Sequence, residues 1–174
     1  MIINIVFKAY NGFMDTATIL GFLQESLFMI IVFGIFLFLA LKKGRQTVTN
    51  VILGLYLALL ISIEFPYYDA ILGNASSAKS ESILMLIVFA GFTFLATILF
   101  HRILPREYDE TSFEGFGKKI LLAVAGTVLV MAFSYHALPV TDLITPGSPI
   151  NYLFASSQSF FYWLIVPILI LYIT

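Results

Sequence analysis

Four long stretches without a charged side chain dominate this sequence. They are Ser26–Leu41, Gln46–Ile63, Ser82–Phe100 and Ile120–Leu138, with sixteen, eighteen, nineteen and nineteen residues. An α-helix rises about 1.5 Å per residue, so roughly 20 apolar residues cross the hydrocarbon core of a bilayer. The sequence therefore predicts an all-α fold, a polytopic transmembrane helix bundle of four or five spans.

The composition agrees with a membrane protein and excludes several other classes. Hydrophobic residues make up 60% of the 174 residues, charged residues make up 11%, and the mean hydropathy is +1.00. These values lie outside the range of ordinary soluble domains. The formal net charge of −1 lacks the basic footprint of a nucleic-acid-binding protein, so we expect no nucleic-acid partner. The absence of cysteine excludes disulfides, thiolate metal sites and cysteine nucleophiles.

We predict one integral membrane domain over residues 1–174. Its spans are expected at about 17–41, 46–63, 82–100 and 120–138, with a fifth at 155–174. The sequence leaves open whether residues 1–14 and 155–174 cross the bilayer or lie on it, since fourteen helical residues reach only about 21 Å. Phe65–Glu81 contains Pro, Gly, Asn and Ser and is predicted to be an extramembrane loop.

The lysines and arginines set the predicted orientation. If the spans alternate, Lys8 and Lys79 lie on one side and the other seven basic residues lie on the opposite side. Those seven are Lys42, Lys43, Arg45, Arg102, Arg106, Lys118 and Lys119. Short cytoplasmic loops are enriched in lysine and arginine. We therefore expect the N-terminus outside, in a multi-pass protein of a bacterial-type inner membrane.

The second predicted span carries a stripe of small and polar residues. Asn50, Gly54, Ala58 and Ser62 are spaced four residues apart and share one helix face. Small residues let helix backbones approach closely in lipid, where packing drives association. The stripe predicts a contact with a neighbouring helix, either within the chain, in a homo-oligomer or in a membrane-protein partner.

The segment 101–119 connects the third and fourth spans and holds eight of the nineteen charged residues. Thr111 and Glu114 fit a capping box, so a helix is expected to begin before the membrane. The acidic residues of this segment are candidates for docking a cytoplasmic partner: Glu107, Asp109, Glu110 and Glu114. The alternative is that these charges only solubilise a turn, balanced by the basic residues beside them.

The sequence contains no nucleotide-binding, zinc-protease or serine-hydrolase motif. No cofactor is expected, and the two histidines, His101 and His136, are predicted on opposite sides of the membrane. We therefore favour a non-enzymatic protein. The alternative is a small channel or transporter subunit, for which Glu25, His136 and Pro167 would be the residues to watch. An intramembrane enzyme could draw only on Glu25 with His136.

The order of these features carries a resemblance. The first span ends in Lys42-Lys43-Gly44-Arg45, and a short second span follows. A third span leads into the charged segment, and Phe113-Glu114-Gly115-Phe116-Gly117-Lys118-Lys119 enters the fourth. Over about residues 16–140 this layout resembles the colicin V production protein family of bacterial inner-membrane proteins. The chain lacks the arginine-glycine pair that often follows in that family. The resemblance implies a role in secretion, envelope maintenance or assembly, with no catalytic residues to carry over.

Overall fold

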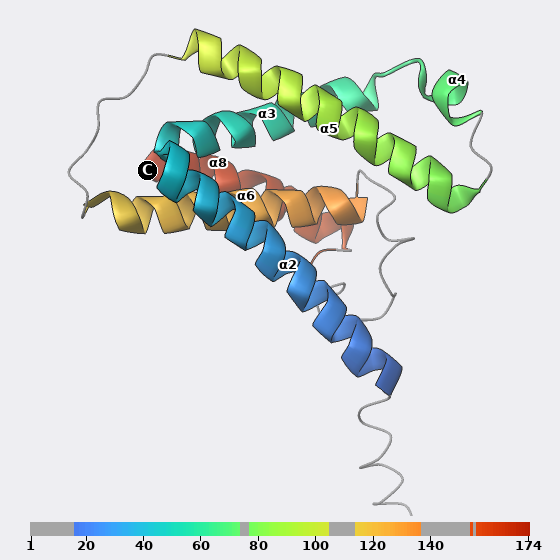
Figure 1. Ribbon diagram of the computed structural model, residues 1–174, viewed down its shortest axis with the longest axis horizontal. Coiled ribbons are helices and arrows are strands. Elements are labelled where there is room, and N and C mark those ends of the chain that lie inside the picture. Colours follow the sequence, from blue (N-terminus) through green and yellow to red (C-terminus); the bar gives the residue numbers. More distant parts are fainter. Residues whose placement is uncertain (1–15, 74–76, 105–113, 137–153, 155) are drawn as a thin grey trace, which may run out of the picture.

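The computed structural model is an all-α helical bundle, which confirms the predicted fold class (Figure 1). The structure describes residues 16–73, 77–104, 114–136, 154 and 156–174. These ranges contain no strand, and their helices are α2 (Thr16–Lys43), α3 (Arg45–Ile63), α4 (Tyr68–Leu72), α5 (Ala78–Ile103), α6 (Glu114–His136) and α8 (Ser157–Ile173).

Four of these helices are long and apolar enough to cross a membrane. The candidate spans are Ser26–Lys43, Arg45–Ile63, Ser80–Ile103 and Gly115–His136. α8 is apolar as well but shorter, with Gln158–Ile173 as its apolar part. The outer faces of the long helices carry large exposed apolar side chains, such as Phe94 and Leu95 on α5 at 66% and 64% exposure. Such surfaces are rare on soluble monomers and suit contact with lipid, so this is a multi-pass membrane protein.

A single residue connects α2 to α3. Gly44 has a φ of 87°, a backbone conformation that residues with a Cβ rarely adopt. The connection between the first two spans is therefore shorter than the predicted bounds, 17–41 and 46–63, imply, because Lys42 and Lys43 belong to α2 and Arg45 already belongs to α3. The two helices diverge from this turn as a V (Figure 1).

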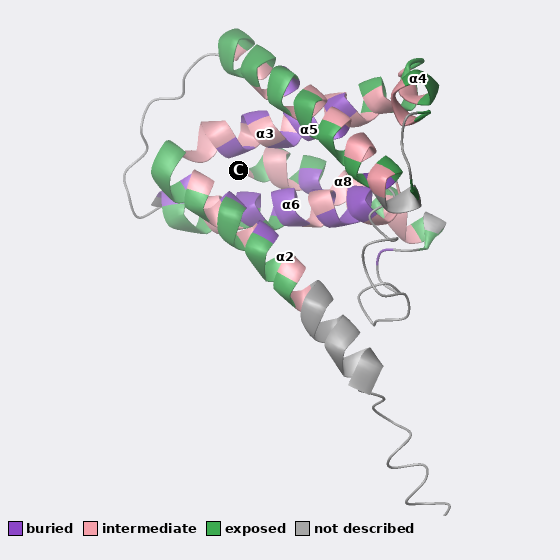
Figure 2. Cartoon of the chain, turned by 45° about the vertical axis from the view of Figure 1, so that its right-hand side comes forward, coloured by how far each residue is buried: buried purple, intermediate pink, exposed green. Residues whose placement is uncertain are grey.

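α6 is the central helix of the bundle. Half of the residues in Gly115–His136 are buried, compared with 11% in Ser80–Ile103 of α5. α6 packs along α2, α3 and α8, whereas α5 packs mainly on α3. Figure 2 shows this difference as a mostly buried α6 and a mostly exposed α5. α5 is thus a peripheral helix with a wide face toward lipid.

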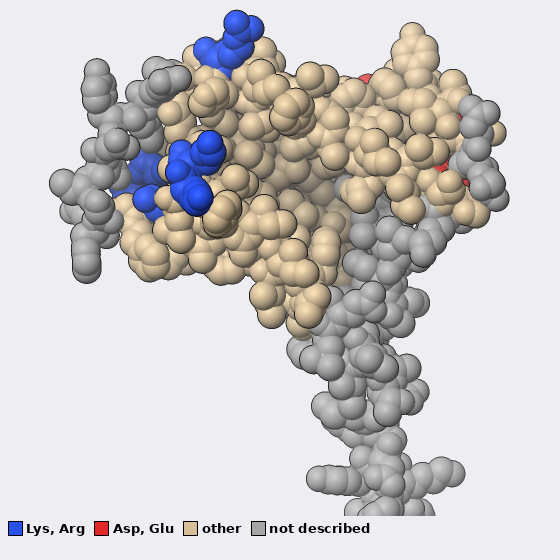
Figure 3. All heavy atoms as spheres, viewed as in Figure 1, with Lys and Arg blue, Asp and Glu red and all other residues tan. Residues whose placement is uncertain are grey.

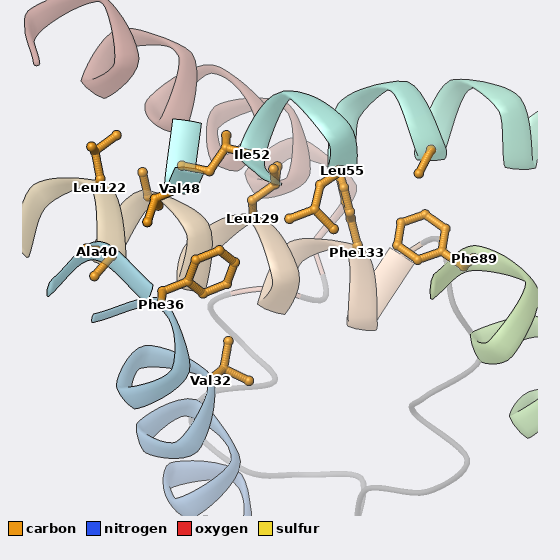
Figure 4. Packing of buried hydrophobic residues seen from close by; sticks show 13 residues of the cluster. Val32, Phe36, Ala40, Val48, Ile52, Leu55, Phe89, Leu122, Leu129 and Phe133 are labelled. Atoms are coloured by element: carbon orange, nitrogen blue, oxygen red, sulfur yellow. The ribbon is translucent and has the colours of Figure 1, made fainter. Parts of the chain in front are cut away.

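The apolar core lies where α2, α3 and α6 meet (Figure 4). Phe36 of α2 lies against Gly126 of α6, where an added Cβ would come within 2.5 Å of the ring. Ile52 of α3 and Leu129 of α6 are fully buried between the helices. Phe133 extends the core toward α5 through an edge contact with Phe89, with ring centroids 6.0 Å apart. Close packing of this kind, with small residues at the crossings, holds membrane helices together.

Two hydrogen bonds attach α8 to α3. The Tyr56 hydroxyl donates to the backbone oxygen of Leu164 over 2.5 Å. Arg45 Nη1 donates to the backbone oxygen of Thr174 over 2.6 Å. The C-terminal helix α8 is therefore held to α3 by hydrogen bonds near its middle and at its end, and it also packs on α6.

The prediction of a loop over Phe65–Glu81 is wrong in part. α4 lies inside it, and α5 begins at Ala78 with Ser77 as its N-cap, the Ser77 hydroxyl accepting from the Ser80 backbone N–H over 3.3 Å. The first turn of α5 contains Glu81, although the sequence predicts a span that begins only at residue 82. A charged residue marks where a helix leaves lipid, not where its hydrogen bonding ends. The capping box at Thr111 lies outside the described residues.

Candidate functional site

Charge is divided between the two ends of the bundle. The basic end, where α2 and α5 finish and α3 and α6 begin, carries Lys42, Lys43, Arg45, Arg102, Lys118 and Lys119. The acidic residues Glu64, Asp69 and Glu81 lie at the opposite end, and the surface between is uncharged on the face seen in Figure 3. Among the described residues, no group of His, Asp and Glu could hold a metal ion.

A cavity of about 510 Å³ is lined by residues of four helices, α2, α3, α5 and α6. Its lining is mostly apolar: Phe28, Val32, Val51, Leu55, Leu86, Phe89, Ala90, Thr93, Phe94, Thr97, Val130, Phe133 and Ser134. Figure 4 shows four of these from four helices, Val32, Leu55, Phe89 and Phe133. The volume falls within the roughly 300–1,000 Å³ of small-molecule sites.

The three hydroxyls in the lining are all used within their own helices. Thr93 donates to the backbone oxygen of Phe89 over 2.9 Å, and Thr97 donates to that of Thr93 over 2.7 Å. Ser134 of α6 donates in the same way to Val130 over 2.8 Å. Each hydroxyl hydrogen is therefore already bonded, and the cavity offers a ligand an apolar wall.

The stripe of small and polar residues on α3 begins against α5. A Cβ added to Gly54 would lie 2.6 Å from Thr97 Oγ1, 3.1 Å from Thr97 N and 3.2 Å from the Thr93 backbone oxygen. Ala58 is fully buried in the core. Ser62 Oγ lies 2.5 Å from the Tyr68 hydroxyl at the acidic end. At Gly54 the backbones of α3 and α5 thus approach so closely that a side chain would meet α5.

Asn50, the first residue of the stripe, is 1% exposed and faces His101. Its Nδ2 lies 3.4 Å from His101 Nδ1 near the basic end. Asn50 Oδ1 is buried and accepts no hydrogen bond from the residues the structure describes. A buried polar atom without a hydrogen bond costs about 1–3 kcal/mol of stability. The pair ties α3 to α5 one turn below Gly54.

The side chains of the remaining acidic candidates from the sequence are not among those the structure describes. Glu107, Asp109 and Glu110 lie outside the described residues, and Glu114 begins α6 with no described side chain. Glu25 likewise lies on α2 without a described side chain.

His136 lies at the far end of α6. Its Nε2 contacts the backbone oxygen of Phe154 at 2.5 Å, and its ring is 4.4 Å from the ring of Phe160. His136 and His101 end different helices, and α6 starts at the end of the bundle where α5 finishes, which places the two histidines at opposite ends.

Sequence reasoning missed the cavity and its lining. Thr93 and Thr97 are spaced four residues apart in the third predicted span, a signal that two small polar residues share one helix face. That spacing could have pointed to the contact with Gly54. Nothing in the sequence shows how far α5 leans away from α2 and α6, which determines the cavity.

The chain was compared with protein-family models, with curated proteins and with solved structures, and none of the three comparisons gave a match.

Proposed function

We propose that this chain is a non-enzymatic protein of a bacterial-type inner membrane that serves as a scaffold in envelope assembly or secretion. It would act by packing against a membrane-protein partner or a second copy of itself. The observation that supports this role is the apolar interior. The cavity among the spans is walled by apolar side chains and by three hydroxyls that already donate within their own helices.

A transporter or channel would need different features at the same depth. Substrate and ion pathways through membranes are lined by ionisable side chains or by broken helices with free backbone groups. The cavity lining contains no ionisable side chain and comes from unbroken stretches of α2, α3, α5 and α6. Pro167 is inside α8 and is buried, away from this lining. These observations favour a packing role over solute passage.

A flux measurement tests the proposal. The purified chain is reconstituted into liposomes loaded with dyes sensitive to protons, potassium or chloride. We expect ion release at the rate of protein-free liposomes. A flux that saturates with ion concentration and disappears in His136→Ala or Glu25→Gln would refute the scaffold role and establish the channel alternative.

A second experiment tests where a partner would dock. Glu107, Asp109 and Glu110 are replaced together by serine, which removes charge without altering any predicted span. If the scaffold docks through this segment, cells should show the deletion phenotype although the protein is inserted at normal abundance. Normal growth with the variant would leave these residues as a solvated turn.

The matched control removes the same amount of charge at the other end. Glu64, Asp69 and Glu81 are exposed and lie at the acidic end of the bundle. Their triple replacement by serine should leave cells normal. A deletion phenotype from the control as well would mean that loss of surface charge, not loss of a docking site, is responsible.

A further inference from the structure

We propose that the cavity between α5 and the pair α2 and α6 binds one acyl chain of an anionic glycerophospholipid, with the lipid phosphate at the basic end of the bundle. This lipid site does not use Glu107, Asp109 or Glu110, the residues proposed to dock a partner, and either site could exist without the other.

The wall of the cavity selects an apolar ligand. Its hydroxyls on Thr93, Thr97 and Ser134 donate to carbonyls one turn back, so a polar ligand would find no free hydrogen there. The remaining lining is aliphatic and aromatic. At this depth the surrounding solvent is lipid, since no water is present in the bilayer core to fill an apolar space. The ligand class that the bilayer itself supplies is the acyl chain.

The mouth of the cavity opens toward lipid along α5. Leu86, Ala90 and Phe94 are spaced four residues apart, line the cavity and are exposed, Phe94 to 66%. Phe89, by contrast, is 5% exposed and reaches the Phe133 ring on the inner side. α5 therefore presents one row of residues at the rim and one inside. A chain lying in the bilayer can enter sideways without unfolding any helix.

The length of the cavity fits the distal part of one acyl chain. The α5 lining runs from Leu86 to Thr97, eleven helical steps, which is about 16 Å along the helix axis. One leaflet contributes about half of the roughly 30 Å hydrocarbon core. The lining is centred about midway between Glu81 and Arg102, so a chain whose phosphate lies at the basic end enters the cavity with its distal half.

Charge decides which end holds the headgroup. Thr97 lies five residues before Arg102, about 7.5 Å along the axis, and Leu86 lies equally far from Glu81. Arg102 is exposed and shares its end with the other basic residues, whereas Glu81 shares its end with Glu64 and Asp69. A phosphate is attracted to the first end and repelled by the second, as at basic lipid-binding pockets on the cytoplasmic side of membrane proteins.

The test fills the mouth of the cavity from Ala90. Full-length protein in detergent is equilibrated with phosphatidylglycerol and phosphatidylcholine of identical acyl chains, and bound lipids are counted by native mass spectrometry. The wild-type protein should retain one phosphatidylglycerol in preference to phosphatidylcholine. Ala90→Phe should lose it, because the added ring occupies the space of the chain. Val51→Phe, which fills the cavity from α3, should do the same and covers the case in which Ala90→Phe does not fold.

The control places the same ring one residue further along α5. A Cβ on Gly91 meets no atom within 4 Å, and Gly91 is not in the cavity lining, so Gly91→Phe should keep the bound lipid. Arg102→Gln should keep an acyl chain bound but reduce the preference for phosphatidylglycerol about fivefold, the effect of one basic residue at an anionic lipid surface.

Three results would overturn the proposal. Equal lipid retention by Ala90→Phe, Val51→Phe and the wild type would place the lipid outside the cavity. Equal retention of phosphatidylglycerol and phosphatidylcholine by the wild type would remove the anionic headgroup from the site. A wild-type dimer that Ala90→Phe dissociates would identify a second copy of the chain as the occupant.

Discussion

The contact between α3 and α5 at Gly54 makes a sharp quantitative prediction about Gly54→Ala. The new methyl carbon would lie 2.6 Å from Thr97 Oγ1 and 3.1 and 3.2 Å from two backbone atoms of α5. Carbon atoms pack best at about 3.5–4.0 Å from their neighbours. The Thr97 hydroxyl can turn away only by losing its bond to Thr93, and the backbone atoms can move only if α5 shifts as a whole.

The expected magnitude follows from two opposing effects. Overpacking of a close contact destabilises by about 1–3 kcal/mol. Replacing glycine by alanine inside a helix contributes about 1 kcal/mol in the other direction. Gly91→Ala is the matched control. It gives α5 the same increase in helix propensity, and no atom lies within 4 Å of the new carbon. The difference in unfolding free energy between the two variants should therefore be about 1–3 kcal/mol, free of the helix-propensity effect.

The assay is reversible unfolding in mixed micelles with increasing sodium dodecyl sulfate. Helix content from circular dichroism and the fluorescence of Trp163, the single tryptophan, follow the transition. In a thermal version, each kcal/mol corresponds to about 2–4 °C for a chain of this size. If Gly54→Ala and Gly91→Ala unfold at the same detergent fraction, α3 and α5 do not approach at residue 54 and the packing described here is wrong.

Three further predictions use the same or simpler measurements. His101→Leu should lower the unfolding free energy by about 1 kcal/mol because Asn50 loses its partner, and adding Asn50→Leu should restore most of the loss; no restoration would show that the two side chains do not interact. Tyr56→Phe should cost about 0.6 kcal/mol, the average worth of an interhelical hydrogen bond in a membrane, and an unchanged transition would mean that α8 does not depend on this bond. Cysteines introduced at Ser77 and Ser112 should react with a membrane-impermeant reagent from opposite sides, Ser77 from outside, and labelling of both from one side would refute the predicted orientation.

The helices themselves were predictable from the sequence because their signal is local. An uncharged run of membrane length must form a helix in lipid, whatever the neighbours are. Four of the described helices, α2, α3, α5 and α6, overlap the first four predicted spans in the same order, whereas α4 was not predicted, and the helix ends differ. The ends differ because charged residues such as Lys43 and Glu81 continue the helical hydrogen bonding beyond the lipid.

Which helices occupy the interior could not be read from hydropathy. The candidate spans of α3 and α6 have the lower mean hydropathy, 1.8, yet they are the more buried, while that of α5 has 2.7 and is the most exposed. Lipid is as apolar as leucine, so a membrane bundle buries small residues such as Ala123, Ala125 and Gly126 in place of the most hydrophobic ones. The small residues of α6 were visible in the sequence, but their partners on α2 and α3 were not.

The candidate site was predictable only where a pattern lies on one helix. The stripe that contains Gly54 and Ala58 could be recognised from its spacing, whereas the partners of its first two members, Thr97 and His101, lie on another helix, more than 40 residues away. The cavity was even harder to predict, because it depends on how several helices are placed relative to one another. It arises from the angles at which α2, α5 and α6 cross α3, and no residue type marks an angle.

The single-residue turn at Gly44 has a consequence for biosynthesis. α2 and α3 emerge together as an open V, but α6, which packs on both arms, ends only at His136, 73 residues after Ile63. At translation rates of about 5–20 residues per second, roughly 4–15 s pass between the completion of α3 and the completion of α6. During this interval the inner faces of the V, with Phe36 and Ile52, must be covered by lipid or by the insertion machinery. A ribosome pause between α3 and α6 would prolong this exposed state, and the nascent chain would then be most open to misassembly.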